Sequence, residues 1–281
     1  MVVKPIVKWA GGKRQLLATL IDSAPVEFER YYEPFVGGGA LLAKFYSLGK
    51  VKKATISDIN KDLINLYKVV KEDPNHLLTE INGIDFKSDK KYYYSMRDLF
   101  NTSHRGSFNP KRAALFLYLN KHSWNGLWRV NSNGIFNVPF GQNRSSSPPS
   151  RTNIMEFHYL LKNIRILAED FQSAVRDAKD GDFVYFDPPY LPIPKANNFT
   201  DYTSHGFSME DQNRLVETCR NLDRNGVKVM ITNSDVPEIW RIFEGFDIRR
   251  VDANNMINSD STKRKGAKAV IITNFGDHRH Y

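Results

Sequence analysis

The sequence predicts an α/β fold with a mostly parallel, twisted sheet and helices on both of its faces. Strand-like and helix-like stretches alternate along most of the chain, which is typical of parallel strands joined by crossover helices. One strand-like stretch runs into a glycine-rich turn, residues 37–39, that opens a helix. Another, the apolar run 183–186, stops at two prolines, because proline lacks the amide hydrogen that a sheet needs.

The elements before residue 73 supply the first half of this sheet. A short strand within 53–60 ends in the acid Asp58. Helices are expected over 14–23, 40–48 and 61–72.

The second half begins with two helix-like stretches, 153–168 and 171–178, which lead to the strand at 183–186. A helix with a capped start at Ser208 then reaches Leu222. Three further strands are expected, at 227–232, 247–251 and 269–273.

Region 73–154 interrupts this alternation. It contains an apolar helix-like stretch, 112–120, and a stretch with Asn-Gly turn signals at both ends, 121–134. We therefore expect a mainly helical insertion with a β-hairpin, and one discontinuous domain made of residues 1–72 and 155–281. Basic, amide and aromatic side chains interleave in the hairpin, which suits contact with DNA; a hairpin with ordinary surface residues is the alternative.

Composition narrows the class of protein. The net charge of +9 in 281 residues and the pI near 9.4 favour an anionic partner, most commonly nucleic acid, although a merely basic soluble protein fits the charge equally well. The single cysteine, Cys219, excludes a disulfide framework and is expected to be a packing residue. No apolar run reaches the length of about 20 residues that spans a membrane, and no signal peptide or His pair for a metal is visible. We expect a cytoplasmic protein without a metal.

The first motif is the run Lys8 to Lys13, in which two glycines let the backbone approach a ligand. A phosphate-binding P-loop is rejected because Val7 and Arg14 occupy the places of its first glycine and its Ser or Thr. A purely structural turn is the alternative.

The glycine turn and Asp58 form the second motif. Small residues such as Gly37 and Gly39 permit close approach of a ligand, and the following helix start offers free amides. Asp58 comes 21 positions after Gly37, at a spacing that suits hydrogen bonds from ribose hydroxyls. A helix cap is the alternative role for Asp58. An adenosine-type pocket without the dinucleotide fingerprint is therefore predicted.

The third motif, Asp187-Pro188-Pro189-Tyr190, follows the strand at 183–186. A carboxylate, a carbonyl and an aromatic ring are thereby presented at the strand's carboxyl end, where ligands bind in open α/β sheets; a simple strand stop is the alternative. With S-adenosylmethionine as cofactor, its sulfonium could rest on Trp9 or Phe35. The acceptor would be the exocyclic amine of a base, held by Asp187 and the Pro188 carbonyl, with Tyr190 stacked on the base.

Such a base must leave the duplex to reach the motif, and Trp124 could fill the gap that it leaves. Cys219 has no Pro-Cys setting, which argues against methylation of cytosine C5 through a cysteine nucleophile.

These motifs and their order resemble the Dam-type DNA adenine-N6 methyltransferases, over nearly the whole chain. The resemblance implies a Rossmann-like, S-adenosylmethionine-dependent methyltransferase sheet with an inserted target-recognition domain, double-stranded DNA as partner, and GATC as the site. It places one group of residues at the cofactor: Trp9, Ala10, Gly11, Lys13, Phe35, Asp58 and Asp187. It places Asp187, Pro188 and Tyr190 at the target adenine.

The resemblance also implies contacts with DNA. Lys8 and Arg129 match positions that read guanines, and Trp124 stands where enterobacterial members carry an intercalating tyrosine. Gln142 replaces a basic residue that many of those members use against a phosphate, and Arg144 could take over that contact. The remaining candidates for the DNA interface are Asn125, Leu127, Pro139, Lys263 and Arg264.

Three alternatives stay open. The acceptor could be cytosine N4 or RNA, the chain could be an inactive DNA-binding relative, or the site could differ from GATC. Whether the enzyme belongs to restriction-modification, to a phage or to a housekeeping pathway is also open. We expect a monomer on DNA.

Overall fold

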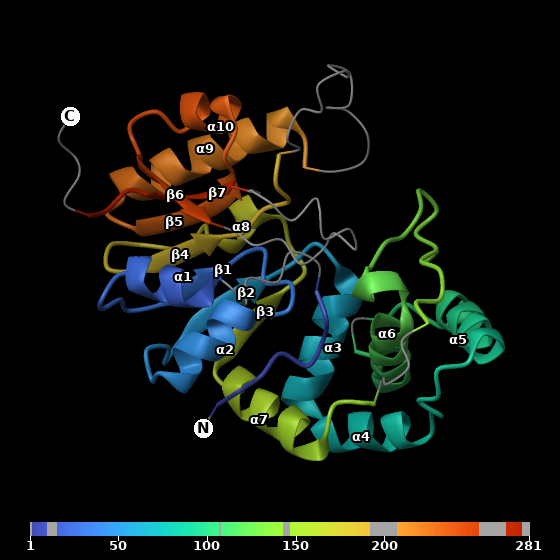
Figure 1. Ribbon diagram of the computed structural model, residues 1–281. Helices are drawn as coiled ribbons and strands as arrows, with labels where there is room; N and C mark the ends of the chain where they lie inside the picture. Colours follow the sequence, from blue (N-terminus) through green and yellow to red (C-terminus); the bar gives the residue numbers. More distant parts are fainter. Residues whose placement is uncertain are drawn as a thin grey trace, which may run out of the picture. The chain divides into compact units, whose positions relative to one another are not determined.

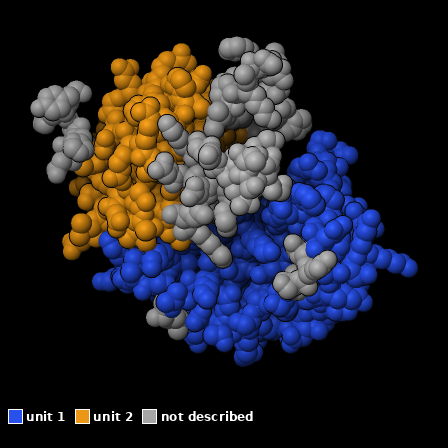
Figure 2. All heavy atoms as spheres, viewed as in Figure 1, with its two compact units in different colours: residues 1–14, 37–52, 58–168 blue, residues 15–36, 53–57, 169–281 orange. Residues whose placement is uncertain are grey.

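The computed structural model describes residues 2–9, 16–106, 108–142, 147–191, 207–252 and 268–276 (Figure 1). The chain divides into two compact units, which Figure 2 colours separately. Unit 1 consists of residues 1–14, 37–52 and 58–168, and unit 2 of residues 15–36, 53–57 and 169–281. The functional division into a catalytic domain and an insertion at 73–154 remains a prediction.

Unit 2 contains a twisted α/β sheet with its strands in the order β2-β1-β4-β5-β7-β6. The strands are β1 (Tyr31–Glu33), β2 (Ala54–Ser57), β4 (Phe183–Phe186), β5 (Lys228–Ser234), β6 (Asp247–Asp252) and β7 (Lys268–Thr273). β1 pairs in parallel with β2 and β4, and β4 pairs in parallel with β5. β7 is antiparallel to both β5 and β6. The predicted mostly parallel, Rossmann-like sheet is confirmed.

Helices cover this sheet and bury an apolar core. They are α1 (Leu17–Ser23), α8 (Phe171–Ala174), α9 (Met209–Arg224) and α10 (Pro237–Ile242). Side chains of α8, α9 and α10 pack with strand residues such as Val184 and Ile231 on one face. Cys219 of α9 is fully buried in this core, and burial raises the pKa of its thiol, so its packing role is confirmed. The capped start of α9 is also confirmed, as a reciprocal capping box between Ser208 and Asp211.

Unit 1 is mainly helical. Its helices are α2 (Ala40–Ser47), α3 (Lys61–Glu72), α4 (Pro74–Asn82), α5 (Lys90–Thr102), α6 (Pro110–His122), the 3-10 turn η1 (Trp124–Gly126) and α7 (Arg151–Leu161). α6 packs against α3, α4 and α5 and is buried nearly all round. The hairpin that follows α6 is irregular, because its described pairing consists of isolated bridges, Ser123 with Phe140 and Val130 with Phe136.

The structure corrects the predicted helix over 153–168. α7 ends at Leu161, and residues 164–167 form the strand β3 (Ile164–Leu167) of unit 1. Ile164 and Ile166 are buried whereas Arg165 is exposed, so this segment has the period of two that marks a strand. α8 is also shorter than the predicted stretch 171–178, and α10 was not predicted.

Among the helices of the described ranges, none has the length and apolar character that crossing a bilayer requires. The same ranges contain no cluster of three or more His, Cys, Asp or Glu side chains that could hold a metal ion.

Candidate active site

Asp187 directly follows β4, whose four residues are all buried. The Asp187 side chain is half-buried, and the hydroxyl of Thr232 on β5 donates a hydrogen bond to its Oδ1 at 2.7 Å. Pro188 is buried and Tyr190 is half-buried. Because β4 and β5 are parallel neighbours, with Phe186 opposite Ile231, the end of β5 supports the carboxylate directly.

The segment after the motif is also fixed by the end of β5. The amide of Leu191 donates to Asn233 Oδ1 at 3.2 Å, and Ser234 Oγ donates to the Leu191 carbonyl at 2.7 Å. On the other side, Gln212 Nε2 of α9 donates to the Pro189 carbonyl at 3.5 Å. The carbonyls and the carboxylate of the motif are therefore presented on a supported backbone. The resemblance to the Dam-type enzymes extends to residues 198–202, which lie outside the described residues.

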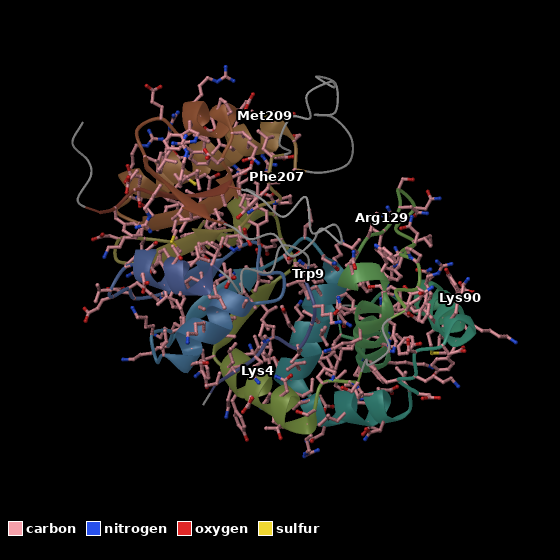
Figure 3. The ribbon with its side chains drawn as sticks, in the orientation of Figure 1. Lys4, Trp9, Lys90, Arg129, Phe207 and Met209 are labelled. Carbon is pink, nitrogen blue, oxygen red and sulfur yellow. The ribbon has the colours of Figure 1, made fainter. Side chains whose placement is uncertain are left out.

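Phe35 lies two residues beyond β1 in an aromatic cluster of unit 2. Its ring is stacked on Phe171 at 5.5 Å between centroids and meets Phe207 edge-on, also at 5.5 Å. The ring is half-buried, so part of its surface is open to a ligand. Figure 3 labels Phe207 among the side chains of this unit.

In unit 1 the structure brings Gly37, Asp58 and Trp9 together. Gly37 has a positive φ of 46°, and a Cβ atom added there would lie 2.6 Å from Cδ1 of Trp9, so only glycine fits under this indole. The Gly37 amide donates to Asp58 Oδ2 at 3.1 Å, and the Asn60 amide donates to Asp58 Oδ1 at 2.9 Å. The Tyr67 hydroxyl fixes this turn by donating a hydrogen bond to the Gly37 carbonyl at 2.5 Å.

The neighbouring contacts exclude the alternative role of Asp58 as a helix cap. The side chain of Asn60 caps α3, accepting from the amides of Asp62 and Leu63, so Asp58 is not the helix cap. Burial raises the pKa of Asp58, and the two amide hydrogen bonds oppose that rise. A carboxylate has about four lone-pair positions, so Asp58 can accept further hydrogen bonds, for example from hydroxyls. Gly39, also with a positive φ, 65°, precedes α2.

The predicted DNA-contacting residues of the described chain lie on the N-terminal segment and the hairpin. Lys8 and Arg129 are exposed, and Figure 3 shows Arg129 on the hairpin. Trp124 is 49% exposed, whereas Trp128 is half-buried and packs on Phe116 at 4.0 Å between ring centroids. Of these two indoles, Trp124 is the more accessible to a partner. Three other predicted residues, Asn125, Leu127 and Pro139, line the same hairpin and are exposed or half-buried.

Six of the predicted site residues lie outside the described residues. They are Ala10, Gly11, Lys13, Arg144, Lys263 and Arg264.

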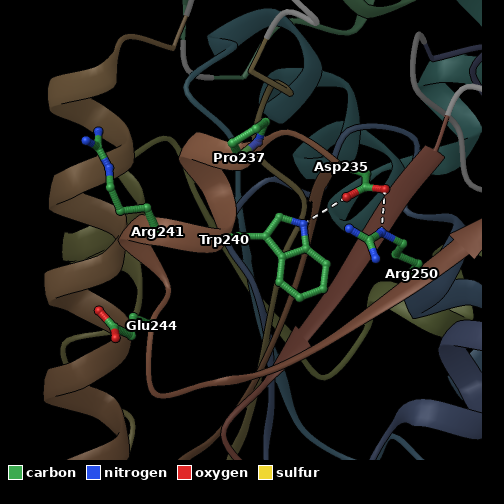
Figure 4. Close-up of a pocket in the computed structure, with 6 residues that line it drawn as sticks. All are labelled: Asp235, Pro237, Trp240, Arg241, Glu244 and Arg250. Carbon is green, nitrogen blue, oxygen red and sulfur yellow. Dashed lines mark hydrogen bonds and ion pairs between the residues drawn. The ribbon is translucent and has the colours of Figure 1, made fainter.

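A groove on unit 2 contains none of the residues that the sequence singled out (Figure 4). Its volume is about 870 Å³, and its lining comes from α10, β6 and the residues beside them. Asp235 accepts from Trp240 Nε1 and from Arg250 Nε, both at 2.8 Å, and the Arg250 guanidinium lies 4.6 Å from the centroid of the indole. Arg241 and Glu244 complete its charged lining. The positive charges of the two arginines in the lining are balanced by the negative charges of Asp235 and Glu244. The lining therefore gives no net electrostatic attraction for an anion.

Sequence reasoning missed the residues that support the site. Thr232 and Asn233 were read only as the end of a strand and its flank, although two polar residues in succession at the end of a buried apolar strand were a usable signal. Asn120, whose side chain holds the backbone of Lys8, was read only as the end of a helix.

The fold of unit 2, with a carboxylate, a carbonyl and an aromatic ring at the carboxyl end of its central strand, defines the class of Rossmann-like methyltransferases. The chain belongs to a particular family of that class: residues 9–257 match the family described as D12 class N6 adenine-specific DNA methyltransferase. It is accordingly an enzyme that methylates adenine N6 in DNA. The family implies S-adenosylmethionine as the methyl donor.

Curated relatives agree with this assignment. The chain is 43% identical to Type II methyltransferase M.MjaIII of Methanocaldococcus jannaschii, over 98% of this chain and 100% of that protein. It is 38% identical to Type II methyltransferase M1.LlaDCHI of Lactococcus lactis subsp. cremoris, over 98% and 96% of the two chains. It is 32% identical to the DNA adenine methylase of Haemophilus influenzae, over 95% and 92%. The resemblance stated from the motifs is confirmed.

Proposed function

We propose that the chain methylates adenine N6 within GATC in double-stranded DNA, with the target adenine turned out of the duplex. The observation that carries the proposal is the placement of Asp187, half-buried, hydrogen-bonded to Thr232 and directly after a fully buried strand. GATC is inferred from the likeness of the hairpin and the N-terminal segment to the Dam-type enzymes.

Asp187, Pro188 and Tyr190 are the proposed catalytic residues. The lone pair of an exocyclic amine is delocalised into the base, which makes the amine a poor nucleophile. Hydrogen bonds from the amine to the Asp187 carboxylate and the Pro188 carbonyl favour a pyramidal nitrogen whose lone pair is available. Tyr190 stacks on the base and offsets part of the cost of extrusion, a few kcal/mol in general. When bound, S-adenosylmethionine supplies the electrophilic methyl group.

The cofactor residues fit S-adenosylmethionine on the geometry of unit 1. Asp58 is a half-buried carboxylate fixed by two amides, with lone pairs left for the ribose hydroxyls. Trp9 offers an aromatic face on the glycine turn, and an aromatic face attracts a sulfonium cation. The other proposed cofactor residues are Ala10, Gly11, Lys13, Phe35, Gly37, Gly39 and Asp187.

Residues 73–154 form the proposed target-recognition domain, and residues 1–72 and 155–281 the catalytic domain. Lys8 and Arg129 read guanines, and Trp124 fills the gap left by the extruded adenine; its exposed indole is available for this role. The remaining DNA contacts are proposed for Asn125, Leu127, Pro139, Arg144, Lys263 and Arg264.

The test is methyl transfer from labelled S-adenosylmethionine to two duplexes that differ only in having GATC or GTTC, followed by digestion to nucleosides. Label in N6-methyladenine from the GATC duplex alone supports the proposal. Equal label in both duplexes overturns GATC, and label in a cytosine product overturns the acceptor. Asp187→Ala should abolish transfer while an unchanged melting temperature shows that the fold survives; retained activity would remove Asp187 from the mechanism.

Extrusion of the base has its own readout. With 2-aminopurine in place of the target adenine, unstacking raises its fluorescence when the enzyme binds. No rise on a GATC duplex at saturating enzyme would contradict base flipping.

A further inference from the structure

Two buried hydroxyl groups lie in series behind the Asp187 carboxylate. Thr232 Oγ1 is 2.7 Å from Asp187 Oδ1, and the Tyr185 hydroxyl is 3.1 Å from the same Thr232 oxygen. Thr232 is 0% exposed and Tyr185 1% exposed, so both hydroxyls are shielded from solvent. All three residues belong to neighbouring strands of unit 2 or the turn after them.

The direction of these hydrogen bonds follows from chemistry. An ionised carboxylate only accepts hydrogen bonds, so the single hydrogen of Thr232 points to Asp187. Thr232 Oγ1 must then accept, and the Tyr185 hydroxyl donates to it. Burial, and after it the negative charge of Asp187, raises the pKa of Tyr185 well above its ordinary value, so its phenol keeps the proton that it donates. The series therefore runs from Tyr185 through Thr232 to Asp187.

We infer that Thr232 is a positioning residue for methyl transfer, and that Tyr185 acts through it. The rotation of a carboxylate about its last side-chain bond is broad in the absence of a partner. A short hydrogen bond from a buried donor narrows that rotation, and the donor is itself fixed by Tyr185. The Asp187 carboxylate is thus oriented before the target amine arrives. This inference rests on the proposed role of Asp187.

The two residues that follow Thr232 at the end of β5 also support the segment that carries Asp187. Asn233 and Ser234 hold Leu191, the residue just past the motif, through one hydrogen bond each. Thr232 is the member of the three whose side chain reaches the carboxylate itself. A valine would fill the same space after the apolar residues Val229 to Ile231 of β5, so packing alone does not explain the hydroxyl.

The experiment compares Thr232→Val, which keeps the shape and removes the hydroxyl, with Thr232→Ser, which keeps the hydroxyl. Labelled methyl transfer to a GATC duplex gives kcat and KM, calorimetry gives cofactor affinity, and melting temperature reports the fold. We expect Thr232→Val to lower kcat by about 10- to 100-fold, the loss typical of one hydrogen bond to a charged group, with melting temperature and KM for DNA unchanged. Thr232→Ser should retain most of kcat.

Tyr185→Phe gives a second, independent variant. It should lower kcat by less than Thr232→Val does, and it should have no further effect in a Thr232→Val background, because it acts through the missing hydroxyl. Thr273→Val is the matched control: Thr273 is also buried in this sheet, but its hydroxyl donates to the Phe275 carbonyl. Its kcat should equal that of the unchanged enzyme.

The outcomes separate this inference from the proposed function. If Asp187→Ala is inactive while Thr232→Val has an unchanged kcat, the inference is overturned and the role of Asp187 stands. If Asp187→Ala remains active, the proposed role of Asp187 fails, and the inference with it. If Thr232→Ser loses as much kcat as Thr232→Val, or if Thr273→Val does, the effect belongs to packing and the positioning role is overturned.

Discussion

Asn120 holds the backbone of Lys8 through two hydrogen bonds. The Lys8 amide donates to Asn120 Oδ1 at 2.8 Å, and Asn120 Nδ2 donates to the Lys8 carbonyl at 2.7 Å. The amide side chain thus pairs with the N-terminal segment as a peptide group of a neighbouring strand would. Gly126 lies against the Lys8 side chain, since an added Cβ atom would be 2.9 Å from Lys8 Cβ. Unit 1 therefore links its proposed guanine-reading lysine to the start of the hairpin.

Asn120→Ala should loosen Lys8 and Trp9 together. We expect a higher KM for DNA, a weaker preference for GATC over singly substituted sites, and weaker cofactor binding, because Trp9 follows Lys8 directly. The measurement is kcat/KM on cognate and substituted duplexes, with calorimetry for the cofactor.

Asn65→Ala is the matched control for Asn120→Ala. Asn65 makes the same kind of pair with the backbone of Asn109, at 2.7 Å to its amide and 3.1 Å to its carbonyl. It should cost similar stability without changing site preference. Equal losses of preference in both variants would show that general loosening of unit 1 is responsible.

Gly37→Ala should displace Trp9. The new methyl group would collide with the indole, and an alanine with positive φ is itself strained by about 1–2 kcal/mol. We expect affinity for S-adenosylmethionine to fall about tenfold or more, equivalent to about 1.4 kcal/mol. Gly49→Ala is the control, since Gly49 has a φ of +72° but nothing within 4 Å of its added Cβ. A control variant that loses as much affinity would assign the effect to backbone strain.

Cofactor affinity should fall in acid because of Asp58. Burial raises its pKa above the ordinary value of 3.8, so Asp58 protonates at a higher pH than an exposed aspartate and loses its charge. Calorimetry as a function of pH should show affinity decreasing as the pH falls through this raised pKa. Asp58→Asn should bind more weakly at neutral pH and show no such decrease.

Protonation of Asp58 does not unfold the protein, so acid unfolding caused by this group cannot explain a loss of cofactor affinity at low pH. A raised pKa means that the folded chain binds the proton more tightly than the unfolded chain, so protonating Asp58 adds stability as the pH falls. If Asp58→Asn kept the same acid dependence as the unchanged enzyme, another group would be responsible.

The sequence predicted those helices and strands whose own residues mark where the element begins or ends. β4 was predicted to the residue, because an apolar run met two prolines, and the start of α9 followed from its capping box. β3 was missed because no proline or glycine separates it from α7, so the helical reading was extended through it. In the structure its strand form shows in the alternation of buried Ile164 with exposed Arg165.

In the candidate active site too, local sequence signals revealed some residues and not others. Asp58 and Asp187 were found because each closely follows its own strand. Their supports were not found, because the partners are remote in sequence: Thr232 is 45 positions from Asp187, and Asn120 is 112 positions from Lys8. Hydrogen bonds between such distant residues follow from the packed fold and leave no local pattern.

Arg112→Met should destabilise the protein strongly. The Arg112 side chain is 2% exposed and donates to both carboxylate oxygens of Asp62, at 2.6 and 3.1 Å. Its replacement by methionine leaves the Asp62 carboxylate without its ion-pair partner. We expect a loss of about 3–5 kcal/mol in the free energy of unfolding, measured by urea denaturation. Arg214→Met should cost only about 0–1 kcal/mol, because Arg214 is 37% exposed beside its acids. Similar losses in the two variants would contradict the dependence on burial.

Arg129→Ala should relax selectivity at one guanine. Arg129 Nε donates to Asn137 Oδ1 at 3.0 Å, which orients a side chain that is otherwise exposed on the hairpin. Loss of a bidentate contact with guanine removes about 1–3 kcal/mol of discrimination, so kcat/KM on GATC should fall while activity on sites substituted at that guanine stays constant. Asn137→Ala should have a smaller effect in the same direction.

Lys263→Ala tests a contact with DNA that depends on charge and not on the base sequence. A phosphate contact carries no sequence information, so its loss should weaken binding to all duplexes alike and reduce the salt dependence by about one charge. Arg129→Ala should leave most of that salt dependence unchanged. If Arg129→Ala instead lowered activity equally on cognate and substituted sites, the residue would contact the DNA backbone, and guanine recognition would have to be assigned elsewhere on the hairpin or to Lys8.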